Sequence, residues 1–245
     1  MSAAPQCRVF AAPEALANEV ADWIAERARG SSHRFALCLS GGTTPRRVYE
    51  LLAAPRRRDV PWQRTHWFWG DERFVPHDDA RSNFHMASEA LLRHVPVPPA
   101  NIHAIPTEQT TPGEAARAYE ATLKRFYGAE TLAAGRPLFD LTLLGLGEDG
   151  HTASLFPNSA ALAESERWVV PVSGPDALER ITLTYPALAS SAATAFLVVG
   201  TSKRAVLERA LAGDATLPAA RLRPAGALYW FADRAAAPMP AHSGA

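Results

Sequence analysis

The chain has few cysteines, no excess of charge of either sign and no long apolar run, and each absence removes a class of protein. Its 245 residues include only two cysteines, Cys7 and Cys38, too few for a disulfide framework or a cysteine-based metal site. Lysine plus arginine equals aspartate plus glutamate at 25 each, so no overall positive field is available to hold nucleic acid or an anionic membrane. Any anion that the protein binds must be held at a local site.

Signals for export, membrane insertion and metal binding are missing as well. No stretch approaches about 18 uninterrupted apolar residues, and residues 1–10 lack the apolar core of a signal peptide. A cytoplasmic location is therefore the expectation. Histidines, cysteines and acidic residues match no familiar ligand spacing, so neither a metal nor another cofactor is expected.

Helical and strand patterns alternate along most of the chain. Leu16, Val20 and Ile24 recur at helical spacing in a predicted helix over residues 13–29. Further helices are predicted over residues 45–52, 82–93, 112–126 and 203–211, and strands over 34–39, 66–69, 102–105, 139–144, 168–172, 180–185, 195–199 and 227–231.

Apolar strands separated by helices are typical of a mostly parallel sheet that is covered on both faces. We therefore predict the α/β class, with a doubly wound, Rossmann-like sheet. No internal repeat or long linker divides the chain, so residues 1–234 are expected to form one domain. Residues 235–245 are rich in Ala and Pro and are expected to form a flexible C-terminal tail.

A turn of small residues follows the first predicted buried strand and precedes a helix. It reads Ser40-Gly41-Gly42-Thr43-Thr44-Pro45. Glycines let the backbone approach an anion, and a helix N-terminus offers unpaired N–H groups and a favourable dipole. The turn is neither a Walker A loop nor a dinucleotide fingerprint. It predicts a phosphate site, although a tight turn with an ordinary helix start has the same pattern.

A second unusual loop, Gly145-Leu146-Gly147-Glu148-Asp149-Gly150-His151-Thr152-Ala153-Ser154, follows the predicted strand over residues 139–144. A histidine beside a carboxylate can act as a general base near neutral pH, with the carboxylate fixing the tautomer. Asp149 and His151 are two residues apart and fit this role. A polar loop with a merely structural histidine is the alternative. Ligands of doubly wound sheets bind where the strand order reverses, so the two loops are expected to face each other there.

Three cations complete the set of candidate residues. Arg73 ends the segment Gly70-Asp71-Glu72-Arg73, which directly follows an aromatic strand. A guanidinium there can pair with a carboxylate or stabilise an oxygen on which charge develops. Lys203 begins a helix after a strand and Gly200, a placement that suits anion binding better than stabilisation of the helix dipole. Arg180 opens a predicted strand. A surface ion pair for Arg73 and a strand-end surface charge for Arg180 remain alternatives.

In combination these segments closely resemble the 6-phosphogluconolactonases of the glucosamine-6-phosphate isomerase/6-phosphogluconolactonase family. The resemblance runs from about residue 9 to about residue 233. Its segments are Ser40–Pro45, Asp71-Glu72-Arg73, Ser82-Asn83, GLGEDGHTASLFP over residues 145–157, Arg180-Ile181-Thr182-Leu183-Thr184, and Gly200 with Lys203. The GLGEDGHTASLFP motif is highly specific, whereas the related deaminases share the glycine turn.

The resemblance implies a metal-independent hydrolase that opens 6-phosphogluconolactone, a step of the pentose phosphate pathway. The substrate would be a small phosphorylated sugar lactone, with no nucleic acid or membrane partner. The oligomeric state is open, and a monomer is compatible with the sequence. The implied phosphate-binding residues are Ser40, Gly41, Gly42, Thr43, Thr44, Arg46, Arg180 and Lys203. His151 would activate water, Arg73 would stabilise the carbonyl oxygen, and Asp71 and Asp149 would support them.

Two other functions compete with the lactonase. Glucosamine-6-phosphate deaminases share the Asp-Gly-His element but typically continue with Ile and Phe-Asn-Glu-Pro, and this chain continues Thr152-Ala153-Ser154-Leu155-Phe156-Pro157-Asn158 without the glutamate. A sugar-phosphate sensor of transcriptional regulators is the non-enzymatic alternative. We expect no helix-turn-helix before Val9, and the net charge is zero.

Overall fold

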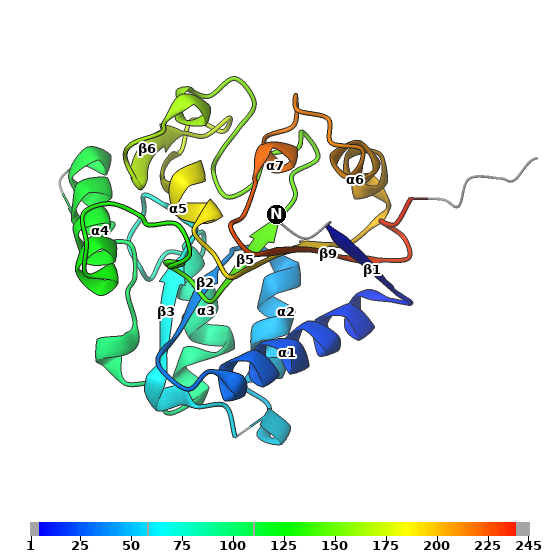
Figure 1. Ribbon diagram of the computed structural model, residues 1–245, viewed down its shortest axis with the longest axis horizontal. Coiled ribbons are helices and arrows are strands. Elements are labelled where there is room, and N and C mark those ends of the chain that lie inside the picture. Colours follow the sequence, from blue (N-terminus) through cyan, green and yellow to red (C-terminus); the bar gives the residue numbers. More distant parts are fainter. Residues whose placement is uncertain (1–4, 58, 110, 239–245) are drawn as a thin grey trace, which may run out of the picture.

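The computed structural model of the protein describes residues 5–57, 59–109 and 111–238. Its centre is a parallel sheet of six strands in the order β1-β9-β8-β5-β2-β3 (Figure 1). The strands are β1 (Gln6–Phe10), β2 (Phe35–Leu39), β3 (Thr65–Trp69), β5 (Leu141–Gly145), β8 (Ala193–Val198) and β9 (Ala227–Asp233). The predicted doubly wound α/β fold is thereby confirmed.

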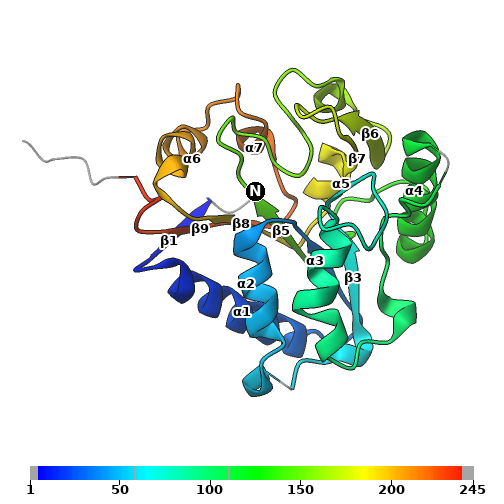
Figure 2. The same cartoon turned by 180° about the vertical axis from the view of Figure 1, so that it is seen from behind.

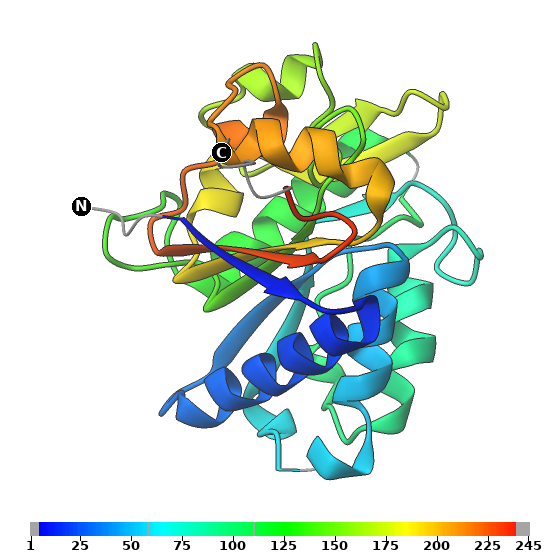
Figure 3. The same ribbon diagram turned by 90° about the vertical axis from the view of Figure 1, so that its right-hand side faces the viewer.

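Helices cover both faces of this sheet. The helices are α1 (Pro13–Gly30), α2 (Thr43–Leu52), α3 (Asn83–Ala90), α4 (Pro112–Tyr127), α5 (Tyr185–Ala189), α6 (Arg204–Leu211) and α7 (Pro218–Arg221). One face carries α1, α2 and α3, and α6 and α7 lie across the other (Figures 1 and 3). All residues of β2 and β8 are buried, as a parallel sheet covered on both faces requires. Within the described residues, no helix is long and apolar enough to cross a membrane.

The strand order reverses between β2 and β5. From β2 the chain builds outward through α2 to β3, and from β5 it builds the other way through β8 to β9. The carboxyl ends of β2 and β5 therefore open a crevice, which is where ligands of such sheets bind. The N-terminal strand β1 joins the far edge beside β9. It was not predicted, because four of its five residues are exposed and it has no apolar pattern.

A second sheet, which the sequence did not reveal, stands at the end of β3. It is antiparallel, with the order β4-β7-β6, and consists of β4 (Asp71–Arg73), β7 (Glu179–Leu183) and β6 (Val169–Ser173). The strands predicted over residues 168–172 and 180–185 exist but belong to this sheet. Figure 2 shows β6 and β7 between α5 and α4. Since only Gly70 separates β3 from β4, the small sheet overhangs the carboxyl end of the parallel sheet.

Several predicted boundaries shift, and one predicted element is wrong. The strand expected over residues 102–105 is reduced to a single bridge between Ile102 and Trp67. Helix α3 ends at Ala90 and is followed by a short 3₁₀ turn. The chain also stays packed past the expected end of the domain at residue 234, since Ala236 is buried and its N–H donates to the Asp233 carboxylate at 2.9 Å. Residues 239–245 of the expected tail lie outside the described part of the chain.

A cluster of histidine and aromatic rings next to β3 makes the stability of the protein depend on pH. His103 stacks on Phe68 with ring centroids 4.4 Å apart, and its Nε2 lies 3.1 Å from Nδ1 of His66. Burial, with a smaller effect of the His66 charge, lowers the pKa of His103 from 6.5 to about 4. The folded protein thus holds His103 neutral where the unfolded chain already binds a proton.

We expect the free energy of unfolding to fall as the pH drops from about 6.5 towards 4, because protons then bind preferentially to the unfolded state. His103→Gln, which cannot titrate, should show a smaller decrease over this range. Urea unfolding at a series of pH values measures both. Equal pH slopes for the two proteins would contradict a lowered pKa at His103.

Candidate active site

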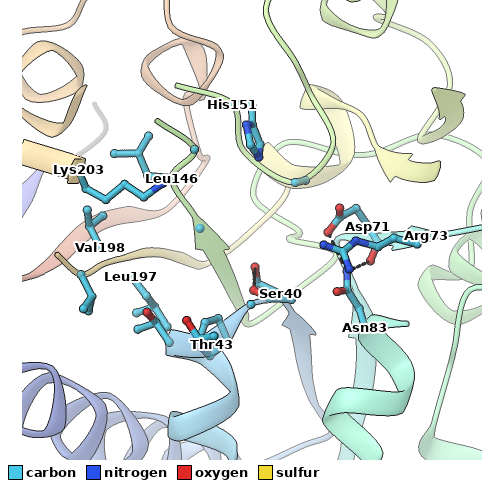
Figure 4. Close-up of a pocket in the computed structure, with 18 of the residues that line it drawn as sticks. Ser40, Thr43, Asp71, Arg73, Asn83, Leu146, His151, Leu197, Val198 and Lys203 are labelled. Carbon is cyan, nitrogen blue, oxygen red and sulfur yellow. Dashed lines mark hydrogen bonds between the residues drawn. The ribbon is translucent and has the colours of Figure 1, made fainter. Parts of the chain in front are cut away.

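A cavity of about 330 Å³ occupies the crevice at the carboxyl ends of β2 and β5. Both unusual loops of the sequence line it. The two loops lie close together, as a Cβ atom placed on Gly145 at the start of one would be 3.9 Å from Oγ of Ser40 in the other. Figure 4 shows Ser40 and Thr43 on one side of the cavity and His151 opposite them, with Lys203 and Arg73 at its two ends. The predicted meeting of the two loops is confirmed.

The glycine turn owes its shape to both of its glycines. Gly42 has a φ of +103°, a conformation that side chains disfavour, and helix α2 begins directly after it. A Cβ on Gly41 would lie 2.0 Å from Oδ1 of Asn83, so a side chain there would have to displace the buried Asn83 amide. The buried Tyr49 hydroxyl binds both backbone groups of Ser40, at 3.0 and 2.8 Å. The turn is thus fixed, with the first amides of α2 at the cavity.

His151 and Asp149 form a hydrogen-bonded pair. Nδ1 of His151 lies 2.6 Å from Oδ1 of Asp149, which also accepts the His151 backbone N–H at 3.1 Å. Partial burial raises the pKa of Asp149, but these hydrogen bonds outweigh it and bring the pKa below its usual range. Asp149 is therefore ionised at neutral pH, and a carboxylate beside Nδ1 favours the neutral tautomer that carries its proton on Nδ1 and can accept one at Nε2.

Strand β4 supplies the polar wall opposite Lys203. Asp71 and Arg73 alternate with Glu72, so both face the cavity while Glu72 points away. Oδ2 of Asp71 accepts a hydrogen bond from the Ser154 hydroxyl at 2.6 Å, and Asn83 Nδ2 donates to the Asp71 carbonyl at 2.9 Å. Asn83 and Ser154 therefore tie β4 to the glycine turn and to the histidine loop.

Glu72 anchors the start of α3. Its carboxylate accepts backbone N–H groups of Asn83 and Phe84, both at 2.7 Å, and the Ser82 hydroxyl at 3.0 Å. Burial raises the pKa of Glu72, and these hydrogen bonds partly offset that effect. A carboxylate at a helix N-terminus also interacts favourably with the dipole. Glu72 thereby places Asn83 against Gly41, and it has a structural role that the sequence did not show.

Removing the Ser154 hydroxyl should destabilise the protein, because the fully buried Ser154 donates to a carboxylate that is itself buried. We expect Ser154→Ala to lower the free energy of unfolding by about 1–3 kcal/mol, the usual effect of leaving a buried polar group unsatisfied. Urea denaturation measures the change. Ser159→Ala, which removes a hydroxyl from the same loop but at a 3₁₀-helix cap, is the control. A loss no larger than that of Ser159→Ala would contradict the importance of the Asp71 contact.

Lys203 reaches the cavity from the loop after β8. Gly200 begins this loop with a φ of +99°, and its N–H donates to Oδ1 of Asp233 at 3.0 Å. The same carboxylate oxygen accepts the Ala236 N–H. The end of β9 therefore fixes the loop that carries Lys203.

The structure brings together most of the residues predicted for the site. Those that line the cavity are Ser40, Gly41, Gly42, Thr43, Thr44, Asp71, Arg73, His151, Arg180 and Lys203. Asp149 does not line the cavity itself but is hydrogen-bonded to His151, which does. Arg46 does not line it, because its side chain is 59% exposed and pairs with Glu50 at 3.2 Å on the outer surface of α2. Sequence reasoning gave no role in the site to Asn83, which was considered only as a helix cap and as a part of the resemblance, or to Ser154, which lies within the specific motif.

The fold and the cavity define a doubly wound α/β protein in which a glycine turn at a helix N-terminus faces a histidine–carboxylate pair. The chain belongs to the glucosamine-6-phosphate isomerase/6-phosphogluconolactonase family, whose model matches residues 11–230. The predicted resemblance is confirmed.

Individual relatives agree with this assignment. A 6-phosphogluconolactonase of Synechocystis is 43% identical over 216 residues, which cover 87% of this chain and 85% of the relative. The crystal structure of 6-phosphogluconolactonase from Thermotoga maritima superposes with a TM-score of 0.81 at 29% identity, covering 94% of this chain and all of that one. The structure of a monomeric glucosamine-6-phosphate deaminase superposes with a TM-score of 0.80 at 20% identity. The match covers 94% of this chain and 98% of the deaminase, which therefore shares the fold.

Proposed function

We propose that the protein hydrolyses 6-phosphogluconolactone to 6-phosphogluconate. The observation that carries this proposal is the shared cavity, in which an imidazole held by a carboxylate at 2.6 Å faces a glycine turn at a helix N-terminus. An ester carbonyl is already electrophilic, so a positioned base and an anchor for the phosphate are sufficient for the reaction. The names of the relatives support the same substrate.

The glycine turn and Lys203 would hold the phosphate. Ser40 and Thr43 offer hydroxyls, Gly41 and Gly42 allow the anion close to the backbone, and the start of α2 adds amides and a favourable dipole. Lys203 supplies the compensating charge. Binding energy from this remote group would then position the lactone carbonyl for attack.

His151 would carry out the proton transfers at the other end of the substrate. Its Nε2 takes a proton from water as the water oxygen attacks C1, and Arg73 stabilises the negative charge that develops on the carbonyl oxygen. The tetrahedral intermediate collapses by breaking the bond between C1 and the ring oxygen, to which His151 returns the proton. Asp149 maintains the tautomer of His151, and Asp71 orients the substrate hydroxyls near Arg73.

A direct assay tests the proposal. Hydrolysis of 6-phosphogluconolactone is compared with ammonia release from glucosamine 6-phosphate, after subtraction of spontaneous lactone opening. We expect fast lactone hydrolysis and no ammonia, since the chain lacks the glutamate of the deaminase motif. Ammonia release, or sugar-phosphate binding without turnover, would overturn the assignment. Equal kcat/KM for lactones with and without the 6-phosphate would refute the role of the glycine turn.

A further inference from the structure

Two buried tyrosines make the same pair of hydrogen bonds at the ends of two neighbouring strands. The hydroxyl of Tyr49, in α2, accepts the N–H of Ser40 at 3.0 Å and donates to the Ser40 carbonyl at 2.8 Å. The hydroxyl of Tyr119, in α4, accepts the N–H of Trp69 at 2.9 Å and donates to the Trp69 carbonyl at 3.0 Å. Both side chains are fully buried, and burial raises the pKa of both hydroxyls, so each keeps the proton that it donates.

The backbone of Ser40 needs such a partner because the parallel ladder ends before it. Leu39, the last residue of β2, accepts the Gly70 N–H at 2.9 Å and so faces β3. Successive residues of a strand direct their backbone groups to opposite sides, so those of Ser40 face β5. The pairing of β2 with β5 reaches only Cys38, because the two strands separate where the crevice opens. The Tyr49 hydroxyl therefore takes the place of a strand neighbour.

The backbone of Trp69 lacks a strand neighbour for a different reason. Strand β3 is at the edge of the parallel sheet, and because Gly70 faces β2, the backbone groups of Trp69 face the free edge. Helix α4 places Tyr119 against this edge, where the hydroxyl supplies the donor and the acceptor that a further strand would supply. Buried N–H and C=O groups without partners are costly, so each tyrosine fixes the backbone at the end of a strand.

Each of these strand ends continues directly into a different part of the cavity. Ser40 begins the glycine turn, at which the phosphate is proposed to bind. Only Gly70 separates Trp69 from β4, whose Arg73 is proposed to stabilise the carbonyl oxygen. Figure 4 shows Ser40 with the glycine turn and Arg73 with β4 as separate parts of the lining. Neither tyrosine lines the cavity itself, so each can act only through the backbone that it holds.

We propose that Tyr49 and Tyr119 are positioning residues for opposite ends of the substrate. Tyr49 sets the phosphate end through the Ser40 backbone, and Tyr119 sets the carbonyl end through Trp69 and the start of β4. The proposal rests on the proposed function, because that reaction assigns the two ends. A displaced phosphate site weakens binding of substrate and transition state alike, which raises KM. A displaced Arg73 affects mainly the transition state, which lowers kcat.

Tyr127 offers a control with the same chemistry away from the cavity. It is buried in the same helix as Tyr119, and its hydroxyl accepts the Ala133 N–H and donates to the Arg136 carbonyl, both at 2.9 Å. Neither Tyr127 nor these two partners line the cavity. Thermal unfolding should show a decrease on the order of 5 °C for a Phe variant at each of the three tyrosines, because each variant leaves two backbone groups unpaired.

Kinetics and binding separate the three variants. Titration calorimetry with sorbitol 6-phosphate, which carries the phosphate but no lactone, measures the phosphate end without turnover. We expect Tyr49→Phe to raise both KM for 6-phosphogluconolactone and Kd for sorbitol 6-phosphate by on the order of tenfold, with a smaller change in kcat. Tyr119→Phe should lower kcat by on the order of tenfold or more and leave this Kd within about twofold of the wild type. Tyr127→Phe should change none of these constants.

The comparison with Tyr127→Phe decides the proposal. If Tyr49→Phe or Tyr119→Phe loses stability but keeps the constants of Tyr127→Phe, that hydroxyl has only a structural role and the proposal for it is overturned. The same change of KM and kcat in both variants would overturn the assignment to opposite ends. Because para-fluorophenylalanine fills the volume of the lost hydroxyl without donating, it replaces a Phe variant that does not fold, and it must show the same shift.

The outcome is separable from the proposed function. A wild type that hydrolyses the lactone, with both variants resembling Tyr127→Phe, would retain the activity and lose the positioning roles. A wild type that binds sorbitol 6-phosphate but does not hydrolyse the lactone would refute the proposed function and the role of Tyr119, while the Kd of Tyr49→Phe would still decide the role of Tyr49. Neither hydrolysis nor binding by the wild type would refute both proposals.

Discussion

Replacing His151 with Asn is expected to lower kcat for 6-phosphogluconolactone by on the order of 10²–10⁴-fold, the usual contribution of a general base. The amide keeps a polar group of similar size beside Asp149 but cannot accept a proton from water. Since the His151 side chain is about one-third exposed and lies on a loop, the fold should be nearly unaffected. Steady-state kinetics, with spontaneous hydrolysis subtracted, measures the effect, and thermal unfolding checks the fold.

His33→Asn is the matched control for this experiment. His33 is exposed and precedes β2, so it lies at the opposite end of that strand from the cavity. We expect its kcat to equal that of the wild type. Full activity in the His151 variant would remove this residue from the mechanism, and with it the proposed path of the proton.

An alanine at position 147 should slow the enzyme strongly without replacing any side chain of the proposed mechanism. A Cβ there would lie 2.1 Å from Nδ1 of His151 and 2.5 Å from Oδ1 of Asp149. The atoms in conflict are the ends of two side chains, so the loop can persist while the pair is displaced. Because a misplacement of about 1 Å can cost 10²-fold in rate, we expect Gly147→Ala to lower kcat/KM by about that factor. Kinetics and thermal unfolding, measured together, test this expectation.

Gly30→Ala provides the comparison, because a Cβ on this residue at the end of α1 would meet nothing within 4 Å. Its kinetics should match those of the wild type. Wild-type kinetics in Gly147→Ala as well would show that the bond between His151 and Asp149 is not needed for turnover. A severely lowered melting temperature would instead mean that Gly147 is required for folding of the loop.

Local sequence patterns were sufficient to predict five of the six strands of the parallel sheet and the helices α1, α2, α3, α4 and α6, but not β1, α5 or α7. Strands such as β2 are apolar throughout because both of their faces are covered, and helix α1 carries an apolar stripe because one side packs on the sheet. The small sheet was not predicted because β4 has only three residues, all polar. Its other strands, β6 and β7, were visible in the sequence, but the pairing of β7 with β4 joins segments about 100 residues apart.

The cations predicted for the site show the same limit. Arg46 lies next to the glycine turn in sequence, yet the rotation of the helix directs its side chain outward to Glu50. The local pattern left open that Arg180 is a strand-end surface charge, and only the family resemblance assigned it to the site. It reaches the cavity because its register with β4 sets it opposite Arg73. Ser154 likewise meets Asp71 only through the path of the loop that follows His151.

The sequence by itself determined the fold class, the family and the two loops that carry the chemistry, because each depends on residues close together along the chain. Tertiary structure alone decided that Arg46 stays outside the cavity and that Arg73 and Arg180 are strand partners. Such contacts depend on strand register and helix rotation, which packing of the whole chain sets. A shift of one residue in a strand would turn Arg180 to the other face.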